Sequence, residues 1–233
     1  MTKIVLFLIV IFLISLVSGA TLNLGDSYQK KETAIGEIVG NVIEQISPEQ
    51  VKLTRNGVEV AFEYGIKNLG GRNFVWLVTP ANEANYTLTV ENVVSNVGGS
   101  VETQDLEKNF FVGNQTSNYF LKPGAIFAAG NFEVTVVLNN DAPETISVDF
   151  PESREIILQS GENKIQFDIE SVGESGIVNL MIGKYSVPAY IVGRGGSPGN
   201  NSGNFGNNES QNNTNESQNE IGNENHDKRR KFC

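Results

Sequence analysis

The fold is indicated most clearly by the stretch Val51-Lys52-Leu53-Thr54-Arg55-Asn56-Gly57-Val58-Glu59-Val60-Ala61-Phe62-Glu63-Tyr64. Its Asn-Gly pair tolerates positive φ at both central positions, as the tight type I′ turn of a β-hairpin requires. A two-residue loop places Leu53 opposite Val60 and Val51 opposite Phe62, so these apolar side chains share one face of the ribbon. The stretch therefore predicts a half-buried antiparallel hairpin.

Further short strands are expected on both sides of this hairpin. Before the turn at Lys122-Pro123-Gly124 they cover residues 73–78, 86–90, 93–97, 101–104, 109–112 and 117–121; after it they cover 125–128, 132–138, 146–150, 154–158, 165–169, 177–182 and 185–192. Alternating apolar residues with turn signals every few residues are typical of an antiparallel sandwich. Helix competes only at residues 33–46, where apolar residues recur at spacings of three and four. Gly36 and Gly40 weaken that helix, so an irregular strand is the alternative.

The predicted fold is all-β, with two tandem small antiparallel sandwiches. The Pro-Gly pair marks a turn, and we place the domain boundary there. The first sandwich then covers residues 21–122 and the second covers residues 123–193.

The N-terminal residues have the pattern of a secretory signal peptide. Lys3 precedes an apolar run over residues 4–17, and Ser18-Gly19-Ala20 supplies the small residues of a cleavage site. We predict a signal peptide over residues 1–20 with cleavage between Ala20 and Thr21. The alternative is an uncleaved membrane anchor, because the apolar run approaches the length of a span.

The C-terminal residues 194–233 are rich in asparagine, glycine and serine. Such a segment has too few apolar side chains to offset the entropy of ordering, so a disordered tail is expected. It ends in the basic cluster Lys228-Arg229-Arg230-Lys231. That cluster has three interpretations: contact with anionic lipid or an acidic polymer, a gene interrupted before an anchor, or a solvated terminus without a role. Cys233 does not have the spacing of a prenylation motif, which favours a free thiol.

The charge balance excludes one class of partner. The chain has 27 Asp and Glu residues against 17 Lys and Arg residues, and five of those cations lie in the leader or the basic end. Nucleic-acid binders need clustered cations, so we expect no nucleic-acid partner. With a single cysteine, the chain forms no internal disulfide, and buried apolar surface must stabilise it.

Catalytic motifs are not found. The single histidine, His226, and the single cysteine, Cys233, both lie in the tail, which excludes Ser-His-Asp, Cys-His and Cys/His zinc arrangements in the folded part. A carboxylate pair is the remaining catalytic possibility. We predict that the protein is not an enzyme and has no cofactor. Asn139-Asn140-Asp141 is oxygen-rich, and a plain turn is favoured over a calcium site there.

Carbohydrate binding is the alternative function, because sugar-binding sandwiches present aromatic rings as flat platforms. Trp76 lies in a continuous apolar run and is predicted to be a core residue. Further candidates for an exposed face are Tyr86, Tyr119, Tyr185 and Tyr190.

Six sequons of the form Asn-x-Ser/Thr are potential N-glycosylation sites in an exported chain. Their acceptors are Asn85, Asn114, Asn200, Asn208, Asn212 and Asn215. An unmodified, solvated tail is the alternative for the last four.

Four stretches carry a resemblance to a known group. They are Leu121-Lys122-Pro123-Gly124, residues 131–138, residues 161–169 beginning Gly161-Glu162-Asn163, and Ile182-Gly183-Lys184-Tyr185-Ser186-Val187-Pro188. Together they resemble archaeal-type secreted and cell-surface proteins with tandem immunoglobulin-like domains. The resemblance implies a fold and an extracellular location, with no particular activity. The expected function is a non-catalytic structural or adhesion protein of the cell envelope. Its expected partners are envelope proteins or extracellular polysaccharide, and membrane contact occurs only through an uncleaved leader or the basic end.

Overall fold

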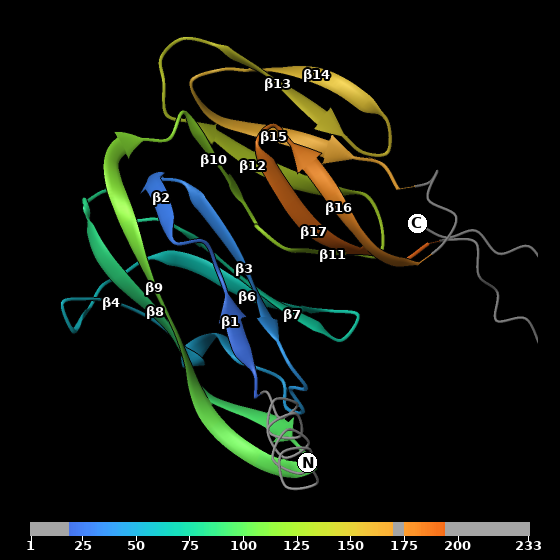
Figure 1. Cartoon of the computed structure of the whole chain (residues 1–233). Helices are drawn as coiled ribbons and strands as arrows, with labels where there is room; N and C mark the ends of the chain where they lie inside the picture. Colours follow the sequence, from blue (N-terminus) through green and yellow to red (C-terminus); the bar gives the residue numbers. More distant parts are fainter. Residues whose placement is uncertain (1–18, 170–174, 194–233) are drawn as a thin grey trace, which may run out of the picture. The chain divides into compact units, whose positions relative to one another are not determined.

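The computed structural model describes residues 19–169 and 175–193, and its regular structure there is β-strand apart from one short 3-10 helix, η1 (Pro48–Gln50) (Figure 1). The predicted signal peptide up to Ser18 and the predicted tail lie outside the described residues. The strands are β1 (Thr21–Asn23), β2 (Ser27–Lys30), β3 (Thr33–Val39), β4 (Val51–Arg55), β5 (Val58–Glu59), β6 (Glu63–Leu69), β7 (Arg72–Val78), β8 (Ala84–Val97), β9 (Ser100–Thr116), β10 (Tyr119–Lys122), β11 (Ile126–Ala128), β12 (Phe132–Leu138), β13 (Glu144–Asp149), β14 (Ser153–Leu158), β15 (Gly161–Phe167), β16 (Gly176–Ile182) and β17 (Tyr185–Ile191).

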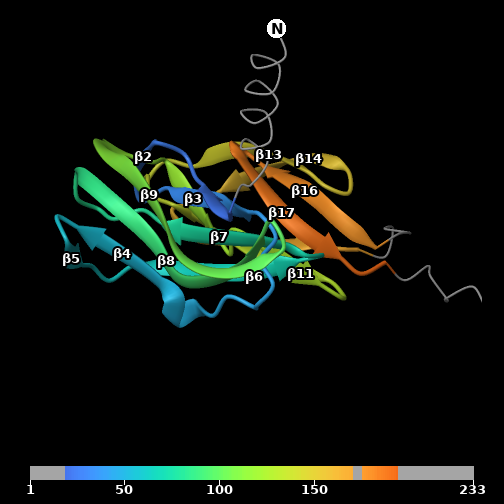
Figure 2. The same cartoon turned by 60° about the horizontal axis from the view of Figure 1, so that its bottom comes forward.

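Strands β1 to β9 form two sheets. One has the order β1-β3-β7-β6 and the other the order β2-β9-β8-β4-β5. Figure 2 shows β4 and β8 side by side, with the short β5 at the edge. All pairings are antiparallel except β2 with β9, which is parallel.

Strands β10 to β17 repeat this arrangement. A three-stranded sheet has the order β10-β12-β15, and a five-stranded sheet has the order β11-β17-β16-β13-β14. Again a single pairing, β11 with β17, is parallel. In both halves the first strand is split into two segments, one on each sheet.

These strand orders are those of the immunoglobulin fold. That fold places its first, second, fifth and fourth strands on one sheet and its third, sixth and seventh on the other. The sheet β1-β3-β7-β6 matches the first set, and β9-β8-β4 matches the second. The later strands match in the same way, with β14 as an extra edge strand and no equivalent of the fourth strand among the described residues. The topology confirms the predicted all-β fold with tandem immunoglobulin-like sandwiches. The described residues belong to one compact unit. Strand β10 pairs with β12, so the strands of the second sandwich begin at Tyr119, before the predicted boundary between residues 122 and 123.

The predicted hairpin is present at its tip and ends early. Asn56 and Gly57 have φ of 51° and 77°, as a type I′ turn requires, and the N–H of Val60 donates to the carbonyl of Leu53 at 2.9 Å. Pairing of Val51 with Phe62 was wrong. The pairing of β4 with β5 stops because β5 ends at Glu59 and the chain then crosses to β6 in the other sheet, whereas Val51 pairs with Val90 of β8 on the opposite edge of β4.

The helical pattern at residues 33–46 was the wrong alternative, since β3 occupies the first half of this segment. β3 pairs with β1 on one side and with β7 on the other, so its backbone N–H and C=O groups are hydrogen-bonded in the sheet. These pairings determine its conformation although its apolar residues fit a helical spacing. Gly36 permits the close approach: a Cβ there would lie 2.8 Å from the carbonyl oxygen of Asn23.

The four strands predicted between residues 86 and 112 belong to two long strands, β8 and β9, which form one hairpin (Figure 1). The register shifts between Val90 and Val93, where Asn92 has a φ of 54°. A β-bulge interrupts the alternation of side chains without ending the strand, which explains why the sequence suggested separate strands. Gly98 and Gly99, both with positive φ, form the tip.

Each sandwich has its own apolar core, and a third cluster joins them. Leu69, Phe74, Trp76 and Ala125 form this third cluster, against which Ile177 and Tyr190 pack. Burial of Trp76, which is 8% exposed, confirms its prediction as a core residue. Within the described residues, no helix is long and apolar enough to cross a membrane.

Candidate functional site

The two sandwiches are connected by buried hydrogen bonds around Thr33, a group of contacts that we call the joint. The hydroxyl of Thr33 on β3 donates to the carbonyl of Leu121 at 2.7 Å and accepts from the N–H of Leu121 at 2.9 Å. The hydroxyl of Tyr185 donates to the carbonyl of Tyr119 at 2.9 Å and accepts from the N–H of Thr33 at 3.4 Å. One threonine hydroxyl therefore serves both backbone groups of a residue in the other sandwich.

Lys184 closes the joint on its outer side. Its ammonium lies 2.7 Å from a carboxylate oxygen of Glu32 and donates to the hydroxyl of Ser117 at 2.9 Å. Its backbone N–H donates to the hydroxyl of Tyr119 at 2.9 Å. Since Lys184 is solvent-accessible, we expect the ion pair to orient the contact more than to stabilise it.

The apolar part of the joint is tightly packed. A Cβ on Gly124 would lie 2.5 Å from the Cβ of Trp76, so only glycine fits this position without displacing the indole. Because Trp76 lies on β7 and Gly124 lies just before β11, this contact fixes the chain between the sandwiches. Domain pairs in one chain usually move unless their interface is well packed and apolar.

Two buried tyrosines, Tyr185 in the joint and Tyr28 on β2, are expected to make the folded protein less stable at alkaline pH. Burial raises the pKa of Tyr185 to about 12 from its ordinary value of 10.0, and burial likewise raises the pKa of Tyr28 to about 12. The folded state thus holds protons that the unfolded state releases, so their stabilisation is complete below pH 10 and is lost as the pH rises through 12. We expect the free energy of unfolding to fall across this window, with a smaller fall in Tyr185→Phe, as measured by denaturant titration at several pH values. A tyrosinate absorbance that rises in a single step near pH 10 in the native protein contradicts this expectation.

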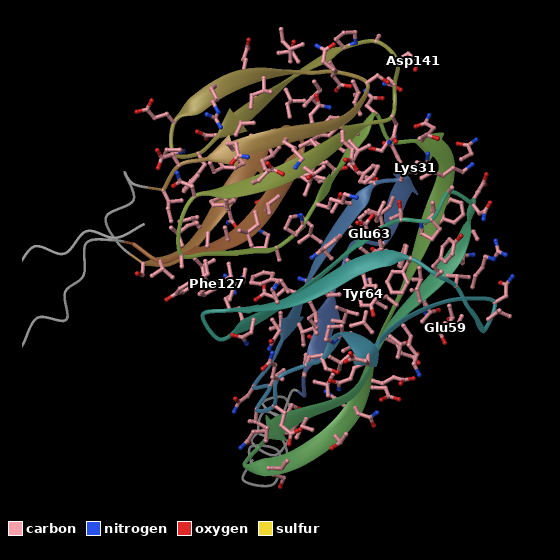
Figure 3. The ribbon with its side chains drawn as sticks, turned by 180° about the vertical axis from the view of Figure 1, so that it is seen from behind. Lys31, Glu59, Glu63, Tyr64, Phe127 and Asp141 are labelled. Carbon is pink, nitrogen blue, oxygen red and sulfur yellow. The ribbon has the colours of Figure 1, made fainter. Side chains whose placement is uncertain are left out.

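A surface hollow of about 630 Å³ lies beside β6. It is lined by the segment after β3, by β6 and β7, and by β11, through residues Val42, Ile43, Glu44, Gln45, Ile46, Pro48, Ile66, Lys67, Asn68, Asn73 and Phe127. Figure 3 labels Phe127 and, on β6, Glu63 and Tyr64. The lining combines aliphatic side chains with amide, carboxylate and ammonium groups.

Phe127 is the aromatic residue of this hollow, and 56% of it is exposed. Its ring is stacked with that of Tyr190, with centroids 5.6 Å apart and planes at 3°. The two residues are cross-strand partners on β11 and β17, which holds the rings parallel. They form a small aromatic platform at the edge of the hollow.

Of the four tyrosines proposed from the sequence, Tyr190 alone belongs to this platform. Tyr86, Tyr119 and Tyr185 are buried, which removes them as candidates for an exposed face; their rings fill the cores while their hydroxyls bond to backbone groups. Tyr190 is half-buried. Sequence reasoning missed Phe127, although its neighbours gave a signal: Ile126 and Ala128 alternate with it and are buried.

Strand β14 is a second candidate site, because a protein partner can bind at the open edge of its sheet. Among the described strands it pairs only with β13, which leaves its other side open. Ile157 on this strand is 63% exposed. Arg154 and Glu155 place charges on the same edge, a common protection against uncontrolled strand addition.

The predicted glycosylation and cleavage sites differ in their exposure, and some of them lie outside the described residues. Asn85 on β8 and Asn114 on β9 are exposed, whereas Asn200, Asn208, Asn212 and Asn215 lie outside the described residues. At the predicted cleavage site, Ala20 is buried and its carbonyl accepts from the side-chain amide of Gln104 at 2.8 Å, while Thr21 begins β1. Cleavage between Ala20 and Thr21 stays a prediction.

The oxygen-rich segment at Asn139 is tied to the joint. The Asn139 side chain donates to the carbonyl of Ser117 at 2.8 Å, and its backbone N–H donates to the carbonyl of Asn118 at 2.7 Å. Asp141 is exposed (Figure 3). Within residues 19–169 and 175–193, no three His, Cys, Asp or Glu side chains lie close enough to hold a metal ion. His226 and Cys233 lie outside these residues.

Comparison with solved structures found chains of similar structure. No family model and no curated protein matches the chain. A solved structure, the I9–I11 tandem from titin, is similar over 74% of this chain and 65% of that chain, with 11% identity and a TM-score of 0.22. The fold assignment above comes from the strand topology and not from this likeness.

Proposed function

We propose that this protein is a non-catalytic structural or adhesion module of the cell envelope, secreted or displayed on the outer cell surface. Its partners are envelope proteins, and β14 is the surface that supports their addition. The archaeal-type secreted proteins that the sequence resembles motivate the location.

The joint is the observation that carries this proposal. A module that sets a spacing, or presents a binding edge in a fixed direction, needs sandwiches that do not pivot. Here a shared apolar cluster and the hydroxyl of Thr33 connect the two sandwiches, with Leu121 bonded through both of its backbone groups. Such contacts suit a spacer better than a hinged ligand clamp.

Surface labelling of intact cells tests the location. We expect a membrane-impermeant amine reagent to label this protein in whole cells, and we expect gene deletion to alter envelope integrity. A cytoplasmic control protein must stay unlabelled in the same cells. Recovery of the protein in the unlabelled cytoplasmic fraction contradicts the proposal.

The second candidate function is binding of extracellular polysaccharide, and the Phe127–Tyr190 platform is the observation that favours it. Sugar rings present C–H faces that pack on aromatic rings, while their hydroxyls bond to amide and charged groups. Asn68 and Lys67 supply such groups in the hollow beside Phe127.

If the platform binds glycan, Phe127→Ala weakens binding by about 5–30-fold, because it removes the ring that stacks on the sugar (~1–2 kcal/mol). A glycan array identifies the ligand, and calorimetry then compares the variants. Phe111→Ala is the matched control, since Phe111 is the other exposed aromatic residue among the described ones and lies on β9. Equal affinities for Phe127→Ala and the unmodified chain contradict this function.

A further inference from the structure

The outer face of the β8–β9 hairpin carries an exposed aromatic ring next to a glycosylation motif. Phe111 on β9 is 39% exposed although it lies in a strand whose neighbouring residues, Phe110 and Val112, are buried. Its cross-strand partner is Asn85, the acceptor of the sequon Asn85-Tyr86-Thr87. Directly opposed residues of antiparallel strands place their Cβ atoms about 4.5–5.5 Å apart on the same face.

The motif is presented in an accessible form on this face. Asn85 is exposed, and no described residue forms a hydrogen bond with its side-chain amide. Thr87 lies two residues along the strand, so its hydroxyl projects from the same face as Asn85. That hydroxyl donates to the side-chain oxygen of Asn109 at 2.6 Å, a contact at the surface.

We propose that Asn85 is N-glycosylated and that the first sugar of the glycan packs on the ring of Phe111. The proposal rests on the extracellular location proposed above. In the transfer, the Asn85 amide nitrogen bonds to the anomeric carbon of a polyprenyl-pyrophosphate-linked oligosaccharide. The bond from that carbon to the pyrophosphate oxygen breaks, the amide nitrogen loses one proton, and the lipid pyrophosphate leaves. An oligosaccharyltransferase catalyses this step on the emerging chain.

The packing explains why an apolar ring lies exposed on an otherwise polar face. Its nearest neighbours on that face are Asn85 and Thr87 on β8, Asn109 and Gly113 on β9 and Ser27 on β2, and a phenylalanine ring left exposed among them gains little burial. The C–H face of a sugar attached at Asn85 can cover the ring and remove its apolar surface from water. The same contact holds the sugar close to the sheet.

Whether Asn85 carries a glycan is tested by expressing the full chain in a eukaryotic secretory host. Trypsin cuts after Arg72 and Lys108, so Asn85 and Asn114 fall in different peptides whose glycans mass spectrometry assigns separately. We expect glycan at Asn85, its loss in Thr87→Ala, and its retention in Thr87→Ser. A secreted, folded chain that lacks glycan at Asn85 overturns the proposal.

Packing on Phe111 is tested by thermal unfolding of glycosylated protein and of protein treated with an amidase that removes the glycan. The background changes Thr116, Ser202, Ser210, Thr214 and Ser217 to alanine, which deletes every sequon except that of Asn85. We expect the Asn85 glycan to raise the Tm by about 1–4 °C, as one aromatic contact in a domain of this size would. Phe111→Ser should remove at least half of that shift, whereas Phe127→Ser, which changes an exposed ring on another strand, should leave it intact. A shift that is unaffected by Phe111→Ser overturns the packing.

These measurements are independent of where the native cell places the protein. If surface labelling alone fails, the proposed extracellular location is wrong, and the native cell does not glycosylate the protein. Absence of glycan in the secretory host removes the site itself.

Discussion

Trp76→Ala lowers the free energy of unfolding by about 3–5 kcal/mol, as deletion of a large buried aromatic ring usually does. The indole is 8% exposed and packs with Leu69, Phe74 and Ala125 in the cluster that joins the sandwiches. Its removal leaves a cavity beside Gly124 and weakens the apolar contact between the two cores. We therefore expect a fall in Tm of about 6–20 °C and a single unfolding transition that splits into two.

Calorimetry and denaturant titration check this result. Trp76→Phe is the partial replacement and should cost less, because an aromatic ring still fills part of the space. Phe127→Ala is the matched control, since that ring is mostly in solvent; it should change stability by no more than about 0.5 kcal/mol. A change of similar size in Trp76→Ala and Phe127→Ala contradicts the assigned packing.

Thr33→Val lowers the free energy of unfolding by about 2–4 kcal/mol, because both backbone groups of Leu121 lose their buried partner. Valine has nearly the same shape, so the effect isolates the hydrogen bonds from the packing. The hydroxyl bonds of 2.7 and 2.9 Å are both within the range of well-formed contacts.

Thr33→Ser is the control for this variant, because it keeps the hydroxyl and removes only a methyl group. It should retain most of the stability that Thr33→Val loses. Chemical denaturation of the two variants side by side measures the difference. If valine and serine are equally tolerated, the hydroxyl does not stabilise the joint.

The parts of the fold that the sequence predicted are those encoded by neighbouring residues. Positive φ at Asn56 and Gly57 follows from the Asn-Gly pair, and the later strands alternate in the same register as their burial. The error at residues 33–46 has the opposite origin. Its apolar residues fit a helical spacing, but two neighbouring strands distant in sequence pair with β3 and determine its conformation.

The candidate sites depended on contacts that a single sequence does not encode. Thr33 and Leu121 are 88 residues apart, and nothing in the sequence around either residue indicates that they meet. Phe127 and Tyr190 meet only because β11 pairs in parallel with β17. The tyrosines at 86, 119 and 185 could be assigned to a face only after the sheets were known, since alternation fixes relative and not absolute direction.

The hairpin tip at Gly98 and Gly99 has a practical consequence. Both glycines have positive φ and both are exposed, and a Cβ added to Gly99 would meet no atom within 4 Å. Extra chain can enter such a turn without moving the paired backbone on either side. An epitope tag inserted between these two glycines would make the protein detectable by antibodies while leaving the joint, the hollow and Asn85 unchanged.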